Sequence, residues 1–119
     1  MTILSQQTCS ACEIGAPLVP NDKQIQLLDD LDGWEIDHSD TSKLIKEFKF
    51  INYEDSVKFA NLIVDLAESQ DHHPKITLEW GSVNIEWWSH KIKGLHLNDF
   101  ICAAKCDLIY QSKINNRKP

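Results

Sequence analysis

The sequence has little of what marks a disordered or fibrous chain, because its 119 residues include only four glycines and four prolines. Apolar residues make up 42% of the chain, enough to offset by burial the entropy lost on ordering. This length fits one domain and is too short for two independently stable ones. Because residues 1–20 show no apolar period, we expect a lead-in there and a single globular domain over residues 21–119.

Long apolar runs and an excess of positive charge are also missing. No stretch approaches the roughly 20 apolar residues of a membrane span, and the first ten residues lack the basic start and apolar centre of a signal peptide. Eighteen acidic against twelve basic residues give a net charge of −6, which does not attract nucleic acid or an anionic membrane surface. We therefore expect a cytoplasmic protein that binds neither nucleic acid nor membrane.

Cysteine is sparse, and in a reducing cytosol its four residues are expected to be thiols and not disulfides. Cys9-x-x-Cys12 has the spacing of half a zinc site. A structural zinc site needs four ligands, however, and Cys102 and Cys106 lie four residues apart on an expected helix. Ordinary thiols are the preferred interpretation, while a bound zinc and a redox disulfide stay open as alternatives.

Hydrophobic periodicity predicts three helices. The first follows a capping box formed by Asn21 and Gln24, the second is capped by Asn52 and runs to about Glu68, and the third carries Asp99 in its first turn. The apolar residues expected on the buried faces are Ile25, Leu28 and Leu31; Val57, Phe59, Ala60, Ile63, Val64, Leu66 and Ala67; and Phe100, Ile101, Cys102, Ala104, Leu108 and Ile109.

Alternating apolar residues predict four strands, over residues 34–38, 44–50, 76–80 and 83–87. The last two form a hairpin around a Gly81-Ser82 turn with a positive first φ angle, and the expected inward residues are Leu44, Phe48, Phe50, Ile76, Leu78, Trp80, Val83, Ile85 and Trp87. Since the connections suit antiparallel hairpins, we predict an α+β fold in the order α-β-β-α-β-β-α. It would have a four-stranded antiparallel sheet with three helices packed on one face.

Three of the five histidines stand at the ends of these elements. His72 and His73 lie between the second helix and the third strand, and His90 follows the fourth strand. In a hairpin the start of one strand lies beside the end of the other, so we expect the three histidines to converge at one edge of the sheet. Pro74 biases His73 toward an extended backbone, which ends the helix and directs the two adjacent imidazoles in different directions.

Clustered imidazoles suit general acid/base chemistry. Imidazole titrates near pH 6.5, so one ring can hold a proton while a neighbour accepts one. Glu68 precedes His72 by one helical turn, and its carboxylate is expected to fix the tautomer of that ring or raise its basicity; Asp99 could do the same for another histidine. The alternative interpretation is that the histidine pair has only a surface or core role.

These residues resemble the signature of the pterin-4a-carbinolamine dehydratases, and every position of that signature is filled. The similarity extends over about residues 21–110, and residues 79–100 together with the lead-in resemble the bacterial branch that serves phenylalanine hydroxylase. The matching pattern is Glu68-x3-His72-His73-Pro74-x5-Trp80-x9-His90-x8-Asp99.

The resemblance implies a reaction and a set of working residues. A 4a-hydroxytetrahydropterin, left when an aromatic amino acid hydroxylase has used its cofactor, loses water to give the quinonoid dihydropterin. The pterin is the substrate, and no metal or other cofactor is expected. His72 and His90 would be the acid/base pair, while His73 would hold and polarise the pterin. The full set implied is His72, His73, His90, Glu68 and Asp99 as catalytic residues, and Asp71, Pro74 and Ser89 as substrate contacts.

The resemblance also bears on packing and assembly. Trp80 is expected to be a core aromatic in preference to a stacking platform. His96 stands where many relatives have Ser or Thr to cap the last helix, so that helix start is expected to be held differently. A homodimer or a dimer of dimers is implied.

Two other classes of function stay open. Vertebrate relatives also act as dimerisation partners of a transcription factor, so the chain could be a protein-binding regulator without a catalytic role. The filled histidine and carboxylate positions favour the enzyme, and nothing in this acidic chain identifies such a partner. The third interpretation is a metal-binding protein that combines the histidines with Cys9 and Cys12.

Overall fold

The computed structural model describes residues 4, 18–90 and 92–116 of the chain. The elements in these residues are α1 (Asn21–Leu28), β1 (Glu35–Asp37), β2 (Lys43–Lys49), α2 (Tyr53–Gln70), β3 (Lys75–Glu79), β4 (Ser82–Trp87) and α3 (Leu97–Asn116). The strands form one antiparallel sheet in the order β1-β2-β4-β3. The predicted α+β fold and the order of its elements are therefore confirmed. Within the described residues, none of the helices is long and apolar enough to cross a membrane.

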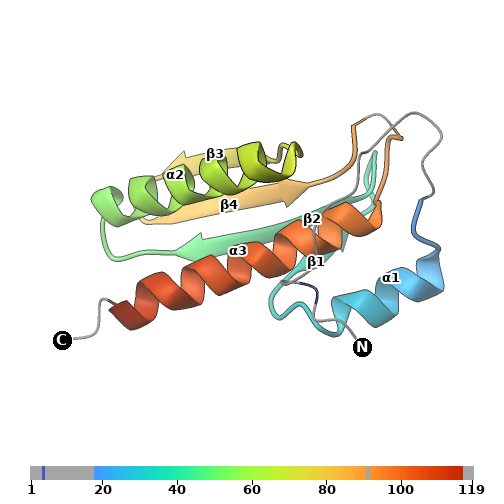
Figure 1. The fold of residues 1–119 in the computed structure, drawn as a ribbon, viewed down its shortest axis with the longest axis horizontal. Helices are drawn as coiled ribbons and strands as arrows, with labels where there is room; N and C mark the ends of the chain where they lie inside the picture. The colour runs from blue at the N-terminus through green and yellow to red at the C-terminus, as the bar shows by residue number, and fades with distance from the viewer. Residues whose placement is uncertain (1–3, 5–17, 91, 117–119) are drawn as a thin grey trace.

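The helices α2 and α3 lie across one face of the sheet, as Figure 1 shows, and the core fills the space between the two layers. Helix α1 joins this arrangement near the beginning of α3, where the backbone N–H of Val19 donates to the carbonyl of Leu95 at 2.8 Å. Leu27 and Leu28 of α1 pack against the core from there. The largest fully buried side chains are Trp87, Phe48, Phe59, Phe100, Leu44, Ile63, Ile85, Leu95, Ile101 and Val83.

Two predicted helix caps have different outcomes. Asn52 caps α2 as expected, because its Oδ1 accepts from the backbone N–H of Asp55 at 2.8 Å. The capping box at α1 is wrong: Pro20 precedes the helix, and Asn21 lies inside it. Gln24 is buried and its Nε2 donates to the partly buried carbonyl of Val19 at 2.8 Å, so this side chain satisfies a backbone acceptor and does not cap the helix.

The predicted β3–β4 turn is wrong by one residue. Ser82 belongs to β4 and pairs with Glu79, so Trp80 and Gly81 form the turn, and the φ of Gly81 is not positive. Gly81 accepts from the backbone N–H of Phe50 at 2.8 Å, which fixes the hairpin tip against the end of β2. This shift moves Trp80 out of the sheet. Its side chain is 67% exposed, so the prediction that it is a core aromatic is also wrong.

The buried stripes of the helices are narrower than the apolar patterns suggested. Ile25, Val64 and Leu108, predicted to face the core, are exposed. In α3 the small side chains of Ala103 and Cys106 are fully buried instead. Small residues allow this helix to lie close to the sheet, so the face that packs is set by fit as well as by hydrophobicity.

Candidate active site

The end of α2 separates the two adjacent histidines. Asp71 has φ 50° and ψ 44°, a left-handed conformation that Asp tolerates better than most residues. The backbone N–H groups of Asp71 and His72 bond back to the carbonyls of Glu68 and Ala67 at 3.4 and 3.1 Å, the pattern of a Schellman motif. After this reversal His72 is buried, whereas His73 remains exposed.

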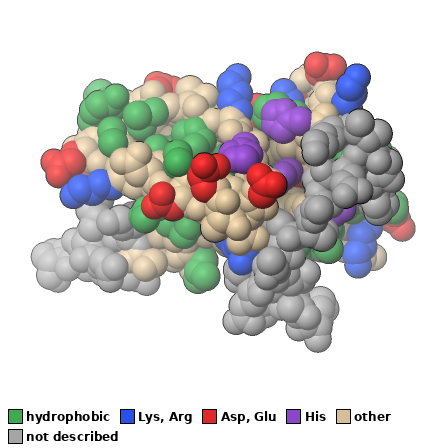
Figure 2. Space-filling view, turned by 45° about the horizontal axis from the view of Figure 1, so that its top comes forward, with side chains coloured by type: hydrophobic (Ala, Val, Ile, Leu, Met, Phe, Trp, Pro, Cys, Tyr) green, Lys and Arg blue, Asp and Glu red, His purple; other side chains and the backbone are tan. Residues whose placement is uncertain are grey.

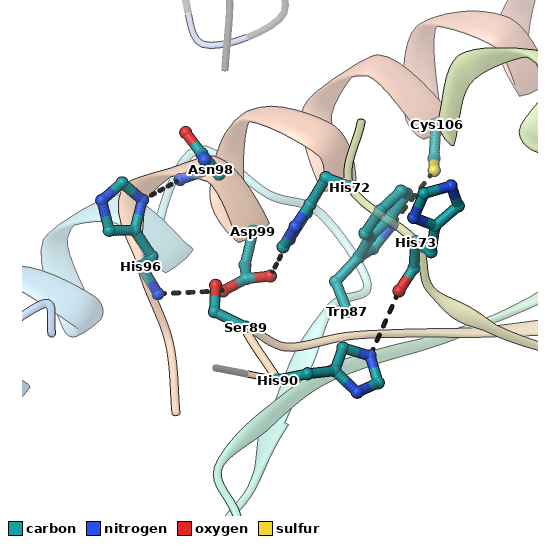
Figure 3. Close-up of polar contacts among 9 residues, drawn as sticks. All are labelled: His72, His73, Trp87, Ser89, His90, His96, Asn98, Asp99 and Cys106. Atoms are coloured by element: carbon teal, nitrogen blue, oxygen red, sulfur yellow. Dashed lines mark hydrogen bonds and ion pairs between the residues drawn. The ribbon is translucent and has the colours of Figure 1, made fainter. Parts of the chain in front are cut away.

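His72 forms a buried pair with the first turn of α3. The side chain of His72 is 6% exposed, and its Nε2 lies 2.6 Å from Oδ1 of Asp99 (Figure 3). The ring nitrogen is the donor because the carboxylate has no proton of its own to give, so Asp99 fixes the Nε2–H tautomer. The ring also stacks on Trp87, with centroids 5.5 Å apart and planes at 12°. Both contacts hold this imidazole in one orientation.

Asp99 is itself fixed on its other oxygen. Its Oδ2 accepts from the hydroxyl of Ser89 at 2.8 Å and from the backbone N–H of His96 at 2.9 Å. His96 in turn caps α3, because its Nδ1 accepts from the backbone N–H of Asn98 at 3.0 Å. This reciprocal arrangement is a capping box in which His96 replaces the usual Ser or Thr. The carboxylate is fully buried, yet three donors and the helix N-terminus stabilise its charge.

His73 pairs with the carboxylate that had been expected at His72. Nε2 of His73 lies 2.7 Å from Oε2 of Glu68, and both side chains are exposed. The predicted pair of Glu68 with His72 is therefore wrong. That prediction assumed that helical spacing continues to residue 72, whereas the left-handed turn at Asp71 brings the next histidine over Glu68.

His90 completes the cluster from the end of β4. Its Nε2 donates to the carbonyl oxygen of His73 at 3.4 Å (Figure 3), so the residue that follows β4 lies beside the residues that precede β3, as the predicted hairpin requires. The ring of His90 lies on Trp88, with centroids 4.4 Å apart. Figure 2 shows histidine side chains gathered beside acidic ones on one face of the molecule.

The remaining predicted site residues surround these histidines at different depths. Asp71 is exposed and Pro74 is half-buried, so both flank the histidine pair near the surface. Ser89 is fully buried and contacts Asp99. The structure thus brings Ser89, Asp99 and His72 together in the interior, and it brings Glu68 and His73 together outside.

A shallow depression of about 370 Å³ lies at the other end of the β3–β4 hairpin. It contains none of the histidines. Its lining residues are Glu47, Lys49, Phe50, Glu79, Trp80, Gly81 and Ser82. Because the groups able to exchange protons near neutral pH are at the opposite end, the histidine cluster and not this depression is the candidate active site.

Sequence reasoning missed the aromatic residues that hold the histidines. Trp87 contacts His72, and its indole Nε1 donates to Sγ of Cys106 at 3.3 Å. Burial raises the pKa of the Cys106 thiol to about 12, so it is a neutral acceptor there. Trp88 contacts His90, and period two along a strand could have indicated this, because residues two apart share a face.

The cysteines and histidines do not gather into a metal centre in the part of the chain that the structure describes. Among those residues, no three or more His, Cys, Asp or Glu side chains are placed to hold a metal ion. Cys102 and Cys106 are buried and form no disulfide, as predicted for them. Cys9 and Cys12, the half zinc site of the lead-in, lie outside the described residues.

The geometry therefore offers one buried imidazole oriented by a carboxylate and two exposed imidazoles beside it. Such a set can donate a proton to one atom of a small substrate and remove a proton from another. Proton transfer of this kind needs no oxidant or reductant.

Comparison with known proteins gives a consistent result. Residues 17–109 match the family model described as pterin 4 alpha carbinolamine dehydratase. A candidate pterin-4-alpha-carbinolamine dehydratase of Vibrio cholerae is 50% identical over 108 residues, which cover 90% of this chain and 99% of that protein. One from Saccharophagus degradans is 48% identical over 112 residues, covering 93% and 99%. A crystal structure of a transcriptional coactivator/pterin dehydratase from Brucella melitensis superposes with a TM-score of 0.74 at 23% identity, covering 79% of this chain and 99% of that chain, which shows a shared fold.

Proposed function

The chain belongs to the pterin-4a-carbinolamine dehydratase family, and from this premise we propose that it removes water from a 4a-hydroxytetrahydropterin. The observation that carries the proposal is the buried His72–Asp99 pair with the exposed rings of His73 and His90 beside it. The product is the quinonoid dihydropterin, which a separate reductase would return to the tetrahydropterin.

The reaction is a balanced transfer of two protons. The C4a–O bond breaks as the hydroxyl group accepts a proton and leaves as water. The N5–H proton is lost while the C4a=N5 double bond forms, so the substrate yields the quinonoid dihydropterin and one water molecule. One imidazolium and one neutral imidazole meet both needs at neutral pH.

His72 and His90 are the acid/base pair in this proposal. The Asp99 carboxylate supports an imidazolium at His72, because a buried opposite charge stabilises the protonated ring. Since only 6% of the His72 side chain is exposed, a substrate can touch no more than an edge of this ring. His90 is exposed on the loop that follows β4, where it can meet the other side of a bound heterocycle.

In this proposal the residues next to the acid/base pair bind the substrate or hold the catalytic groups in place. His73, held by Glu68, contacts and polarises the pterin, while Asp71 and Pro74 border it on either side of the histidine pair. Ser89 is too deeply buried for wide contact with a substrate, so its main contribution is to hold Asp99.

The setting of the reaction is a further part of the proposal. The product would serve the tetrahydropterin cycle of an aromatic amino acid hydroxylase, phenylalanine hydroxylase in the first place, because residues 79–100 resemble that bacterial branch. We place the reaction in the cytoplasm and expect a homodimer or a dimer of dimers. Sedimentation of the purified protein measures that assembly directly.

The test is the rate of 4a-carbinolamine breakdown measured by stopped flow. His72→Ala and His90→Ala should each lose roughly 10²-fold of the acceleration, the lower end of what positioned proton transfer gives. His38→Ala is the control for loss of an exposed imidazole: His38 follows β1 at the same end of the sheet, but β2 lies between β1 and β4, and the ring of His38 bonds to Ser42. Equal rates for all three variants and wild type, with unchanged circular dichroism, would refute the assignment.

A further inference from the structure

Two consecutive tryptophans stand at the end of β4: Trp87 is its last residue and Trp88 follows it. Trp87 is fully buried in the core, whereas Trp88 is half-buried and packs against the edge of the core. Each indole lies against a different histidine of the site: Trp87 contacts His72 and Trp88 contacts His90. Trp88 is therefore the aromatic neighbour of the exposed member of the proposed acid/base pair.

His90 has few other restraints among the described residues. It is exposed, and the polar contact of its ring, from Nε2 to the carbonyl of His73, is 3.4 Å long. This is beyond the 2.7–3.2 Å typical of protein N–H···O bonds, so the bond alone orients the ring poorly. The centroids of His90 and Trp88 are 4.4 Å apart with planes at 35°, nearer than those of His72 and Trp87 at 5.5 Å. Contact with the indole is thus the stronger restraint on this imidazole.

Lys43 fixes the indole in its turn. Leu44 of β2 pairs with Trp87 of β4, and this register brings the preceding residue, Lys43, next to Trp88. The Lys43 ammonium lies 4.5 Å from the centroid of the indole, within the range of a cation–π contact. Lys43 is half-buried at the start of β2, so the side chain that contacts Trp88 is itself anchored in the sheet.

We propose that Trp88 is a positioning residue that holds the His90 imidazole in its working orientation, with Lys43 steadying the indole. The proposal rests on the proposed function, since it assigns Trp88 an effect on the proton transfer at His90. A displacement of a reacting group by about 1 Å can cost up to 10²-fold in rate. Because His90 keeps its hydrogen bond to His73 when the indole is lost, we expect a smaller decrease, roughly tenfold.

The experiment is a double-mutant cycle on kcat for 4a-carbinolamine dehydration. Trp88→Leu should lower kcat roughly tenfold with little change in KM, and Trp88→Phe should restore most of the loss because it keeps an aromatic face. Trp88→Leu added to His90→Ala should have no further effect, since Trp88 acts through the missing ring. A further loss in that background, or a Phe variant no better than Leu, would overturn the proposal. Trp80→Leu is the control, because Trp80 is exposed at the far hairpin tip and should leave kcat unchanged.

A second readout does not depend on catalysis. The indole ring current should displace the ring-proton resonances of His90 in an NMR spectrum, and Trp88→Leu should return them by several tenths of a ppm while Trp80→Leu does not. Lys43→Met should move them partway. If neither Trp88→Leu nor Lys43→Met changes the chemical shifts of His90, the proposal is wrong even if the enzyme is active. An inactive wild type with a large shift would instead refute only the proposed function.

Discussion

Nε2 of His72 and Oδ1 of Asp99 lie 2.6 Å apart in the interior of the protein, joining the end of α2 to the first turn of α3. The same carboxylate accepts from Ser89 and from the backbone of His96. The orientation of one working imidazole is therefore determined by how two helices meet, and not by the loop that carries the histidine.

Asp99→Asn should remove the negative charge from the His72–Asp99 pair while keeping the size and shape of the side chain. An amide can still accept on one oxygen, but its NH2 group must face one of the three donors that Asp99 now accepts. We expect roughly 10²-fold lower kcat, because the imidazolium loses its counter-charge, and a loss of about 1–3 kcal/mol in the free energy of unfolding. Stopped-flow rates and urea unfolding measure both. Glu79→Gln, on the exposed side of β3, should change neither, and wild-type kcat in the Asp99→Asn variant would count against the pair.

Glu68→Gln should affect substrate binding more than the chemical step. The pair of Glu68 with His73 is exposed, so its loss should change the free energy of unfolding by less than about 1 kcal/mol. If His73 holds the pterin, loosening it should raise KM severalfold and leave kcat nearly unchanged. Glu54→Gln, which breaks the exposed pair with Lys58, is the matched control with no expected effect on KM. A large fall in kcat with an unchanged KM would contradict the binding role of His73.

Asp107 should make stability depend on pH in a direction opposite to that of most paired carboxylates. Burial raises its pKa from 3.8, and the bonds from Lys46 at 2.8 Å and Trp34 at 3.0 Å offset this only in part. The folded state thus keeps a proton that the unfolded chain has already lost, so the unfolding free energy falls as pH rises from 3.8 through the folded-state pKa. Urea unfolding at half-unit steps of pH measures the free energy of unfolding of wild type and of Asp107→Asn. The wild-type value minus the variant value should decrease through this window and then level off. A difference that rises with pH would show that the ion pair outweighs burial.

Cys106 should be inert to thiol reagents in the folded protein. Burial raises the pKa of its thiol to about 12, and the thiolate is the reactive form. In a Cys9→Ser/Cys12→Ser background, Ellman's reagent should find no rapidly reacting thiol until denaturant is added, and then two. The same shift predicts a fall in stability as pH rises from 9 toward 12, because the unfolded chain ionises first. Rapid labelling of the native protein would mean that α3 opens readily.

The fold could be predicted from the sequence because its elements have strong local signals. The β4 pattern of Val83, Ile85 and Trp87 and the Asn52 cap are both found as expected. The hairpin turn could not be placed so well. Choosing Trp80-Gly81 over Gly81-Ser82 depends on the contact of Gly81 with Phe50 across the sheet, which has no local signature.

The sequence predicted which residues belong to the candidate site but not which carboxylate pairs with which histidine. Antiparallel registration alone brings His90 to His73, and that contact follows from strand positions. Which carboxylate serves which histidine depends on a single backbone angle at Asp71, and Asp favours the left-handed conformation too weakly for it to be assumed. Trp88 and Lys43 were missed because their contact requires the β2–β4 register, which no short segment specifies.

The turn at Asp71 gives the two neighbouring imidazoles unequal surroundings, one dry and one wet. Both residues are histidines, so their different surroundings depend only on how many residues separate each of them from the end of α2. Inserting a single amino acid between Asp71 and Pro74 would shift the start of β3 by one residue relative to the end of α2. A side chain other than that of His72 would then lie next to Asp99. This connection should therefore tolerate changes of residue far better than changes of length.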